Sequence, residues 1–184
     1  MPATIEGKKV AFLATDGVEQ VELDRPWQAI IDAGGRPELV SLESGEIQAF
    51  NHLDKAERKR VDRSIDEARP DSYDALVLPG GVANGDFVRA DERAVRFVRD
   101  FFDSGKPISV ICHGGWVLAE ADVVRGMTMT SWPSLRTDLR NAGAEWVDQE
   151  VVTDKGLVSS RMPKDLDAFC AKTIEEIAEG KHAR

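Results

Sequence analysis

Three short apolar runs, each closely followed by glycine, constrain the fold of this chain more than any other feature. They are residues 10–14, 73–78 and 107–111. Short apolar runs bounded by turn residues are typical of buried strands. Helical patterns lie between them, and alternating strands and helices favour a mostly parallel sheet with helices on both faces. The ligand site of such a sheet lies at the carboxyl ends of its strands, where these three runs end.

The remaining elements follow from periodicity and from helix-ending residues. After the first strand we expect a helix with Pro26 in its first turn, closed by Gly34-Gly35, so that Glu19 and Glu22 lie before it or in its first coil. The charged stretch 54–69 is predicted to be irregular. Further strands are predicted at 38–42, 47–50, 127–131, 151–152 and 157–160, and further helices at 91–104, 135–141 and 166–177.

Length and charge limit the domain organisation and the partners. A chain of 184 residues with 42% hydrophobic content is long enough for one core and short for two, so we expect a single domain over residues 1–184. The net charge of −9 opposes binding to nucleic acid or to anionic membranes, because the field repels phosphate. The basic cluster within 55–60 lies among acidic residues and is interpreted as a solvated loop or helix face.

Targeting signals and metal motifs are not apparent. No apolar run approaches the length of a membrane span, and residues 1–9 lack the apolar core of a signal peptide, so we expect a cytoplasmic protein. Cys112 and Cys170 form no CxxC pair, and the three histidines show no zinc-ligand spacing. We therefore expect no metal and no cofactor.

Cys112 is the leading candidate for a nucleophile. It ends an apolar strand and precedes His113-Gly114-Gly115, a turn that would aim backbone N–H groups and a helix dipole at the thiol. Such surroundings lower the pKa of a thiol. The alternative is a buried structural thiol, and Val110 stands where the G-x-nucleophile-x-G elbow pattern has glycine. Cys170 shares the apolar face of the last helix and is predicted to be a small core residue.

Few histidines are available to act as a base. His52 lies in a polar loop and His182 in a tail expected to fray, so His113 is the candidate, although neighbouring side chains at an elbow tend to point apart. The alternative is that His113 only lines the pocket. Because no good histidine follows Cys112 at a distance, assignment as a glutamine-hydrolysing amidotransferase is weakened.

Carboxyl and amide groups complete the predicted site. Glu22 or Glu19 beside a thiolate should keep its proton, the alternative being a surface carboxylate in an ion pair. Backbone N–H groups of Gly80, Gly81 and His113, with Gly114 beside them, are candidates for an oxyanion hole. The alternative is that these glycines are present only because the chain turns there.

These residues together resemble the PfpI family of intracellular proteases and stress proteins, whose superfamily includes the parkinsonism-associated protein deglycase. The resemblance covers nearly the whole chain and is carried by Glu19-x-x-Glu22-x-x-x-Pro26, Tyr73-Asp74-Ala75-Leu76-Val77-Leu78-Pro79-Gly80-Gly81, Gly105-Lys106-Pro107, Ile111-Cys112-His113-Gly114, Asn141-Ala142-Gly143-Ala144-Glu145 and Ser159-Ser160-Arg161.

The resemblance implies a flavodoxin-like three-layer α/β sandwich with a nucleophile elbow, similar to class I glutamine amidotransferases, and a homodimer or higher homo-oligomer. Cys112 matches the family nucleophile, His113 its neighbour and Glu22 a protonated glutamate against the thiolate. Asp86 is the nearest match to an acid that reaches the histidine of an adjacent subunit. Trp116 is expected to wall the pocket or to pack beneath the helix.

Three functions stay open at this point. A cysteine-dependent hydrolase would act on a small dicarbonyl or a glycated protein, as a deglycase or glyoxalase. A PfpI-like cysteine peptidase would act on peptides through an acyl-enzyme. A non-enzymatic sensor or chaperone of oxidative stress would respond through oxidation of Cys112. We rank the hydrolase first, and the sequence does not fix its substrate, its oligomer size or the resting oxidation state of Cys112.

Overall fold

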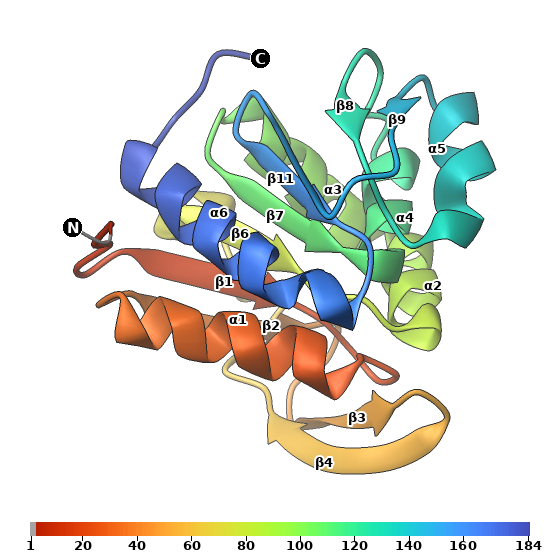
Figure 1. Cartoon of the computed structure of the whole chain (residues 1–184). Helices are drawn as coiled ribbons and strands as arrows, with labels where there is room; N and C mark the ends of the chain where they lie inside the picture. The colour runs from red at the N-terminus through yellow and green to blue at the C-terminus, as the bar shows by residue number, and fades with distance from the viewer. Residues whose placement is uncertain (1–2) are drawn as a thin grey trace.

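The computed structural model describes residues 3–184 as strands and helices that alternate along most of the chain (Figure 1). The strands are β1 (Lys9–Leu13), β2 (Arg36–Ser41), β3 (Glu46–Asn51), β4 (Asp54–Arg60), β5 (Arg63–Ser64), β6 (Ala75–Leu78), β7 (Ile108–Ile111), β8 (Thr128–Met129), β9 (Glu145–Trp146), β10 (Val151–Asp154) and β11 (Leu157–Ser160). The helices are α1 (Gln20–Asp32), α2 (Val82–Ala90), α3 (Glu92–Asp103), α4 (Gly115–Glu120), α5 (Arg136–Asn141) and α6 (Leu166–Glu179), with short 3-10 turns between some of them.

The central sheet has the strand order β10-β11-β7-β6-β1-β2-β5, and all its pairs are parallel except β10 with β11. The three apolar runs form β1, β6 and β7, which lie side by side at its centre. Their registers pair Val10 with Ala75 and Leu76 with Ile108. The predicted mostly parallel sheet, and with it the flavodoxin-like class, is therefore confirmed.

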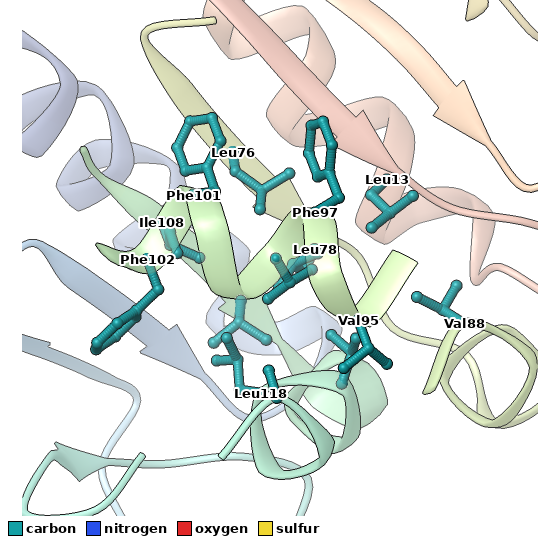
Figure 2. Close-up of a cluster of buried hydrophobic side chains, with 14 of the residues drawn as sticks. Leu13, Leu76, Leu78, Val88, Val95, Phe97, Phe101, Phe102, Ile108 and Leu118 are labelled. Atoms are coloured by element: carbon teal, nitrogen blue, oxygen red, sulfur yellow. The ribbon is translucent and has the colours of Figure 1, made fainter. Parts of the chain in front are cut away.

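Helices cover both faces of this sheet, because successive side chains of each strand point to opposite sides. Ala11 and Leu13 of β1 belong to the core beneath α2, α3 and α4, whereas Val10 and Phe12 belong to the core beneath α1 and α6. Figure 2 shows the first core, in which Phe97 and Phe101 of α3 pack over Leu76 of β6. The result is a three-layer sandwich whose central strands, β1, β6, β7 and β11, are buried on both faces.

The first helix begins earlier than predicted. Pro26 lies inside α1, which starts at Gln20, and not in its first turn. The Glu19 carbonyl accepts the amides of Glu22 and Leu23 and so starts the helix. Proline at position 26 removes only the N–H that would bond to the Glu22 carbonyl. This earlier start places Glu22 in the first turn of a helix.

Other predicted elements differ in ways that physical chemistry explains. The stretch 54–69 is not wholly irregular, because β4 pairs with β3 as an antiparallel hairpin and carries the basic cluster on an exposed strand. Helix α2 was not predicted, since its mostly polar and small residues lack an apolar stripe. The run 127–131 forms only β8, which pairs with β9 outside the main sheet. Cys170 is half-buried at the margin of the core, and not fully inside it.

Candidate active site

The turns after β1, β6 and β7 meet at one edge of the sheet. Cys112 has a φ of 60°, in the left-handed region that non-glycine residues seldom occupy. A Cβ on Gly80 would overlap the Glu22 carboxyl and lie 2.6 Å from Cys112 Cβ. Because the backbone at Gly80 passes this close, the three turns bring Glu22, Gly80 and Cys112 together, although they are far apart in the sequence.

The Cys112 thiol lies where the turns after β1, β6 and β7 meet. Cys112 is 7% exposed, and its Sγ is 3.2 Å from Nδ1 of His113. The backbone N–H groups of Gly81 and His113 lie near enough to the sulfur to lower its pKa. The two neighbouring side chains at the elbow do not point apart, so the imidazole is placed to exchange a proton with the thiol.

The expectation that the elbow lowers the pKa of this thiol is wrong for the resting chain. Burial raises the pKa of Cys112, and an ionised Glu22 would raise it further. The two amides at the sulfur lower the pKa but do not offset burial. Cys112 therefore rests as a thiol and must lose its proton when it reacts.

Glu22 is fully buried in the first turn of α1, with no exposed surface. Burial first, and then the charge of Glu19, raise its pKa from 4.5 to about 8. The Cys112 thiol and the Gly80 amide face the carboxyl and lower the pKa slightly, yet neither makes a hydrogen bond of ordinary geometry with it. Glu22 is consequently a neutral acid at pH 7, able to donate a hydrogen bond toward the sulfur.

His113 is held between two indole rings. Its ring stacks on Trp132 with centroids 5.6 Å apart and meets the edge of Trp116 at 5.2 Å. Burial lowers the pKa of His113, so the imidazole is neutral at pH 7. In the tautomer with its proton on Nε2, Nδ1 is free to accept the proton of the thiol.

A cavity of about 670 Å³ opens above the thiol. Its walls are mainly apolar and aromatic, with carboxyl groups at its floor and rim. The lining residues are Gly17, Glu19, Glu22, Phe50, His52, Leu53, Gly81, Val82, Ala83, Asp86, Phe87, Cys112, His113, Trp116, Trp132 and Pro163. This cavity, called the Cys112 pocket below, is large enough for a small molecule or for one modified side chain.

The structure brings most of the predicted site residues to this pocket, but not all in the expected orientation. Glu19, at the start of α1, accepts the His52 amide from the hairpin β3–β4. Of the predicted glycine donors, the Gly81 amide interacts with the thiol and the Gly80 amide with the Glu22 carboxyl. Gly114 closely approaches the carbonyls of Leu78 and Pro79. Trp116 both lines the pocket and donates from its indole N–H to an acid of α5, at 2.8 Å.

Asp86 lies at the pocket rim, exposed on α2. Within residues 3–184 of one chain, no hydrogen bond joins its carboxyl to the His113 ring. A role for Asp86 in orienting His113 would therefore need a second subunit.

Sequence reasoning missed Trp132, His52 and Phe87 as pocket residues. Trp132 directly follows the strand predicted at 127–131 and was given no role, and its backbone N–H donates to the Cys112 carbonyl at 3.2 Å. His52 and Phe87 lie on the hairpin β3–β4 and on α2, which were only partly predicted or not predicted. A lone tryptophan after a small polar pair gives no local signal for a pocket wall.

Among the residues that the structure describes, the His, Cys, Asp and Glu side chains with metal-binding spacing are Glu176, Glu179 and His182, which lie away from the Cys112 pocket. Within the same residues, no helix combines the length and apolar character needed to cross a membrane.

A doubly covered parallel sheet with a cysteine on a left-handed turn beside a neutral glutamate defines a class of flavodoxin-like proteins with a cysteine elbow. Residues 8–176 match the DJ-1/PfpI family, and the chain belongs to that family. The expected resemblance is confirmed.

Two relatives and one solved structure illustrate this membership. The chain is 44% identical to protein/nucleic acid deglycase 2 of Escherichia coli over 88% of this chain and 93% of the relative. It is 41% identical to deglycase PfpI of Pyrococcus furiosus over 91% of this chain and 98% of the relative. The structure of Schizosaccharomyces pombe DJ-1 has a TM-score of 0.82 at 23% identity, covers 91% of this chain and 90% of its own, and shows the shared fold.

Proposed function

We propose that this protein is a cysteine-dependent hydrolase of the deglycase type, which removes dicarbonyl adducts from amino groups. The observation that carries the proposal is the 3.2 Å contact of Cys112 Sγ with a neutral His113, beside a neutral Glu22 at the floor of the pocket. Relatives named as deglycases in Escherichia coli and Pyrococcus furiosus support it.

The first step of the proposed reaction uses the proton that Cys112 retains. A hemiaminal formed from methylglyoxal and an amine carries a hydroxyl and the former amine on one carbon. The sulfur bonds to this carbon and the carbon–nitrogen bond breaks. The thiol proton passes to His113 Nδ1 and then to the leaving amine, so the products are a free amine and a hemithioacetal on Cys112.

The second stage converts the hemithioacetal into a hydroxy acid. A proton moves from the carbon bearing sulfur to the neighbouring carbonyl carbon, and the hydroxyl proton of the first carbon moves to the oxygen of the second. This isomerisation yields a lactoyl thioester without any external oxidant. Water then hydrolyses the thioester to lactate and regenerates the thiol. Glu22 donates a hydrogen bond to the reacting groups, and the Gly81 and His113 amides stabilise the negative charge that develops on oxygen.

The first test measures lactate and free amine from a methylglyoxal-treated peptide, in a buffer without amines or thiols, with reduced protein. We expect many turnovers for the unmodified chain and none for Cys112→Ala. His113→Gln should lower kcat by about 10²-fold or more, because it removes the base but keeps the pocket shape. One equivalent of product per thiol, or turnover that survives Cys112→Ala, contradicts the proposal.

The same assay separates the alternative substrates. An untreated peptide tests the peptidase alternative, and free methylglyoxal tests a glyoxalase. A methylglyoxal-treated nucleotide is included because the Escherichia coli relative is named for nucleic acid as well as protein. The net charge of −9 opposes affinity for long polyanions, so we expect the glycated peptide to be the better substrate.

The geometry also favours a second candidate, oxidation of Cys112 to a sulfinate. The neutral Glu22 carboxyl has no partner of ordinary geometry and would donate to a sulfinate oxygen. Graded peroxide should then add two oxygens selectively at Cys112, seen by intact mass and peptide mapping. Glu22→Gln should preserve part of this selectivity and Glu22→Leu should abolish it, whereas random oxidation would contradict the sensor.

The proposal includes a homo-oligomer and a reducing, cytoplasmic setting for a stress-response role. Large apolar side chains exposed around the pocket support an oligomer. The unpaired Cys112 and Cys170 are consistent with a compartment that keeps thiols reduced. Light scattering on the purified chain measures the oligomer, and a monomer at micromolar concentration would contradict this part.

A further inference from the structure

A second group of chemistry-bearing side chains lies where the chain leaves α6. It consists of Glu176 and Glu179 on the last turns of α6 and His182 in the segment that follows, called the C-terminal cluster below. His182 lies against Gly105 and Gly156, which precede β7 and β11, whereas Cys112 follows the other end of β7. Figure 1 shows β7, β11 and the C-terminal segment after α6. Nothing in the proposed reaction uses it.

His182 is held in place from several sides. Its backbone N–H donates to the Gly105 carbonyl at 2.8 Å. A Cβ on Gly105 would lie 2.5 Å from the His182 carbonyl oxygen, and one on Gly156 would lie 2.8 Å from its ring. Two turns thus need glycine to admit this histidine, and the tail is not frayed as the sequence suggested.

Arg184 fixes the other side of the same segment. Its guanidinium donates to the carbonyls of Phe102 at 2.7 Å and Lys155 at 2.8 Å, and lies 4.3 Å from the centre of the Phe102 ring. The His182 ring is therefore positioned by backbone contacts before any ligand arrives, which lowers the entropic cost of using it as a ligand.

The donor atoms of the cluster face one another. His182 Nε2 is 3.0 Å from Glu176 Oε2 and 3.7 Å from Glu179 Oε2, and all three atoms lie within 4.8 Å of one another. Glu176 is only 6% exposed, and its Oε2 and the His182 Nε2 are both buried without a hydrogen bond of ordinary geometry. A neutral imidazole nitrogen and a carboxylate oxygen 3.0 Å apart would point lone pairs at each other, so this buried contact needs a cation between the two atoms, either a proton on His182 or a metal ion.

We propose that the C-terminal cluster binds one divalent transition metal of the zinc type. One imidazole nitrogen and two carboxylate oxygens suit Zn²⁺, whereas Mg²⁺ and Ca²⁺ prefer oxygen alone. Donors on a tetrahedral zinc with bonds of about 2.05 Å lie about 3.3 Å apart, and the two distances from His182 bracket this value. Glu179 is half exposed, which leaves a fourth position open to water.

The bound metal would link α6 to the C-terminal segment that contains His182, which packs against the turns before β7 and β11. A ligand that binds only the folded chain raises its stability. The expected effect is therefore structural, and it is separate from the reaction at Cys112.

The test titrates Zn²⁺ alone into the untagged full-length chain, by calorimetry and by thermal unfolding. The chain carries Cys112→Ser and Cys170→Ser, so that thiolates do not bind the metal. We expect one equivalent to bind and to raise Tm. His182→Gln and Glu179→Gln should each weaken binding about tenfold or more, because even outer-shell changes cost this much. His52→Gln, which changes an exposed histidine elsewhere, should leave binding unchanged.

Glu179 is exposed enough for its substitution to leave folding intact, so the test does not depend on the buried Glu176. Absence of binding at high micromolar Zn²⁺ overturns the proposal. So does binding that survives either substitution, or a loss of Tm in His182→Gln that is equal with and without Zn²⁺, which would show an ion pair only. None of these outcomes bears on the deglycase assay.

Discussion

At the scale of single residues, Glu22 is the side chain whose behaviour departs most from its ordinary chemistry. Its fully buried carboxyl keeps a proton at pH 7 because ionisation would place a charge in an apolar interior beside Glu19. A neutral donor next to a neutral thiol avoids two buried charges. Neither Glu22 nor Cys112 therefore carries a charge before the substrate binds.

Glu22 should make stability depend on pH. Its pKa is about 8 in the folded chain and 4.5 in the unfolded chain, so the folded state keeps a proton that the unfolded state releases. The contribution of Glu22 is full below about pH 4.5 and falls as the pH rises toward 8. Urea unfolding of the unmodified chain and Glu22→Gln should differ by an amount that declines between pH 5 and pH 8 by on the order of 3 kcal/mol. A constant difference would contradict the neutral acid.

Glu19 should set the upper pH limit of the proposed reaction. Its negative charge raises the pKa of Glu22, so Glu19→Gln should lower that pKa. Glu22 would then ionise at lower pH, and the alkaline limb of kcat should move to lower pH. The pH–rate profile checks this, with Glu150→Gln, an exposed acid, as the control. If the alkaline limb did not move, the charge of Glu19 would not control the ionisation of Glu22 in the reaction.

At the scale of elements, the site depends on turns that let backbones approach closely. Gly81 has a φ of 95°, and a Cβ on it would overlap the Gly17 carbonyl and lie 2.7 Å from the Glu19 amide. The turn after β6 thus packs directly on the turn after β1. A side chain at position 81 would separate the strand ends that hold Cys112 and Glu22.

Two glycine substitutions distinguish crowding from backbone strain. Gly126 has a similar φ of 76° but open space around it, so Gly126→Ala should cost about 1 kcal/mol from strain alone. Gly81→Ala carries the same strain and also the overlap, so its cost should be roughly 2–4 kcal/mol. The free energies of unfolding of the two variants measure this difference. Equal costs would show that the two turns do not constrain each other.

At the scale of the whole molecule, two cores hold the sheet between its helices. Phe101 is fully buried between α3 and the sheet, whereas Phe87 on α2 is half exposed at the pocket rim (Figure 2 shows Phe101). Phe101→Ala should cost about 3–5 kcal/mol, because it removes a large core side chain and leaves a cavity. Phe87→Ala should cost less than about 0.5 kcal/mol. Denaturant unfolding of both checks this, and similar costs would contradict the assignment of the core.

The sequence predicted the elements that carry strong local patterns. β1, β6 and β7 are apolar throughout, and α3 and α6 show regular apolar stripes, so their type followed from periodicity. β4 and α2 carry charged, polar or small residues, and their structure depends on partners elsewhere in the chain. The start of α1 was predicted wrongly because proline prefers the first turn of a helix. In the structure Pro26 lies inside α1, at the loss of one backbone hydrogen bond.

By itself, the sequence determined the fold class, because strand runs buried on both faces and closed by glycine are compatible with few architectures other than a covered parallel sheet. It also determined which residues are chemically capable of reaction, among them Cys112, His113 and Glu22. Only the tertiary structure decided their ionisation and their contacts, since the pKa of a buried group depends on what surrounds it. The same holds for His182, whose place beside Glu176 depends on two distant glycine turns and not on any local pattern.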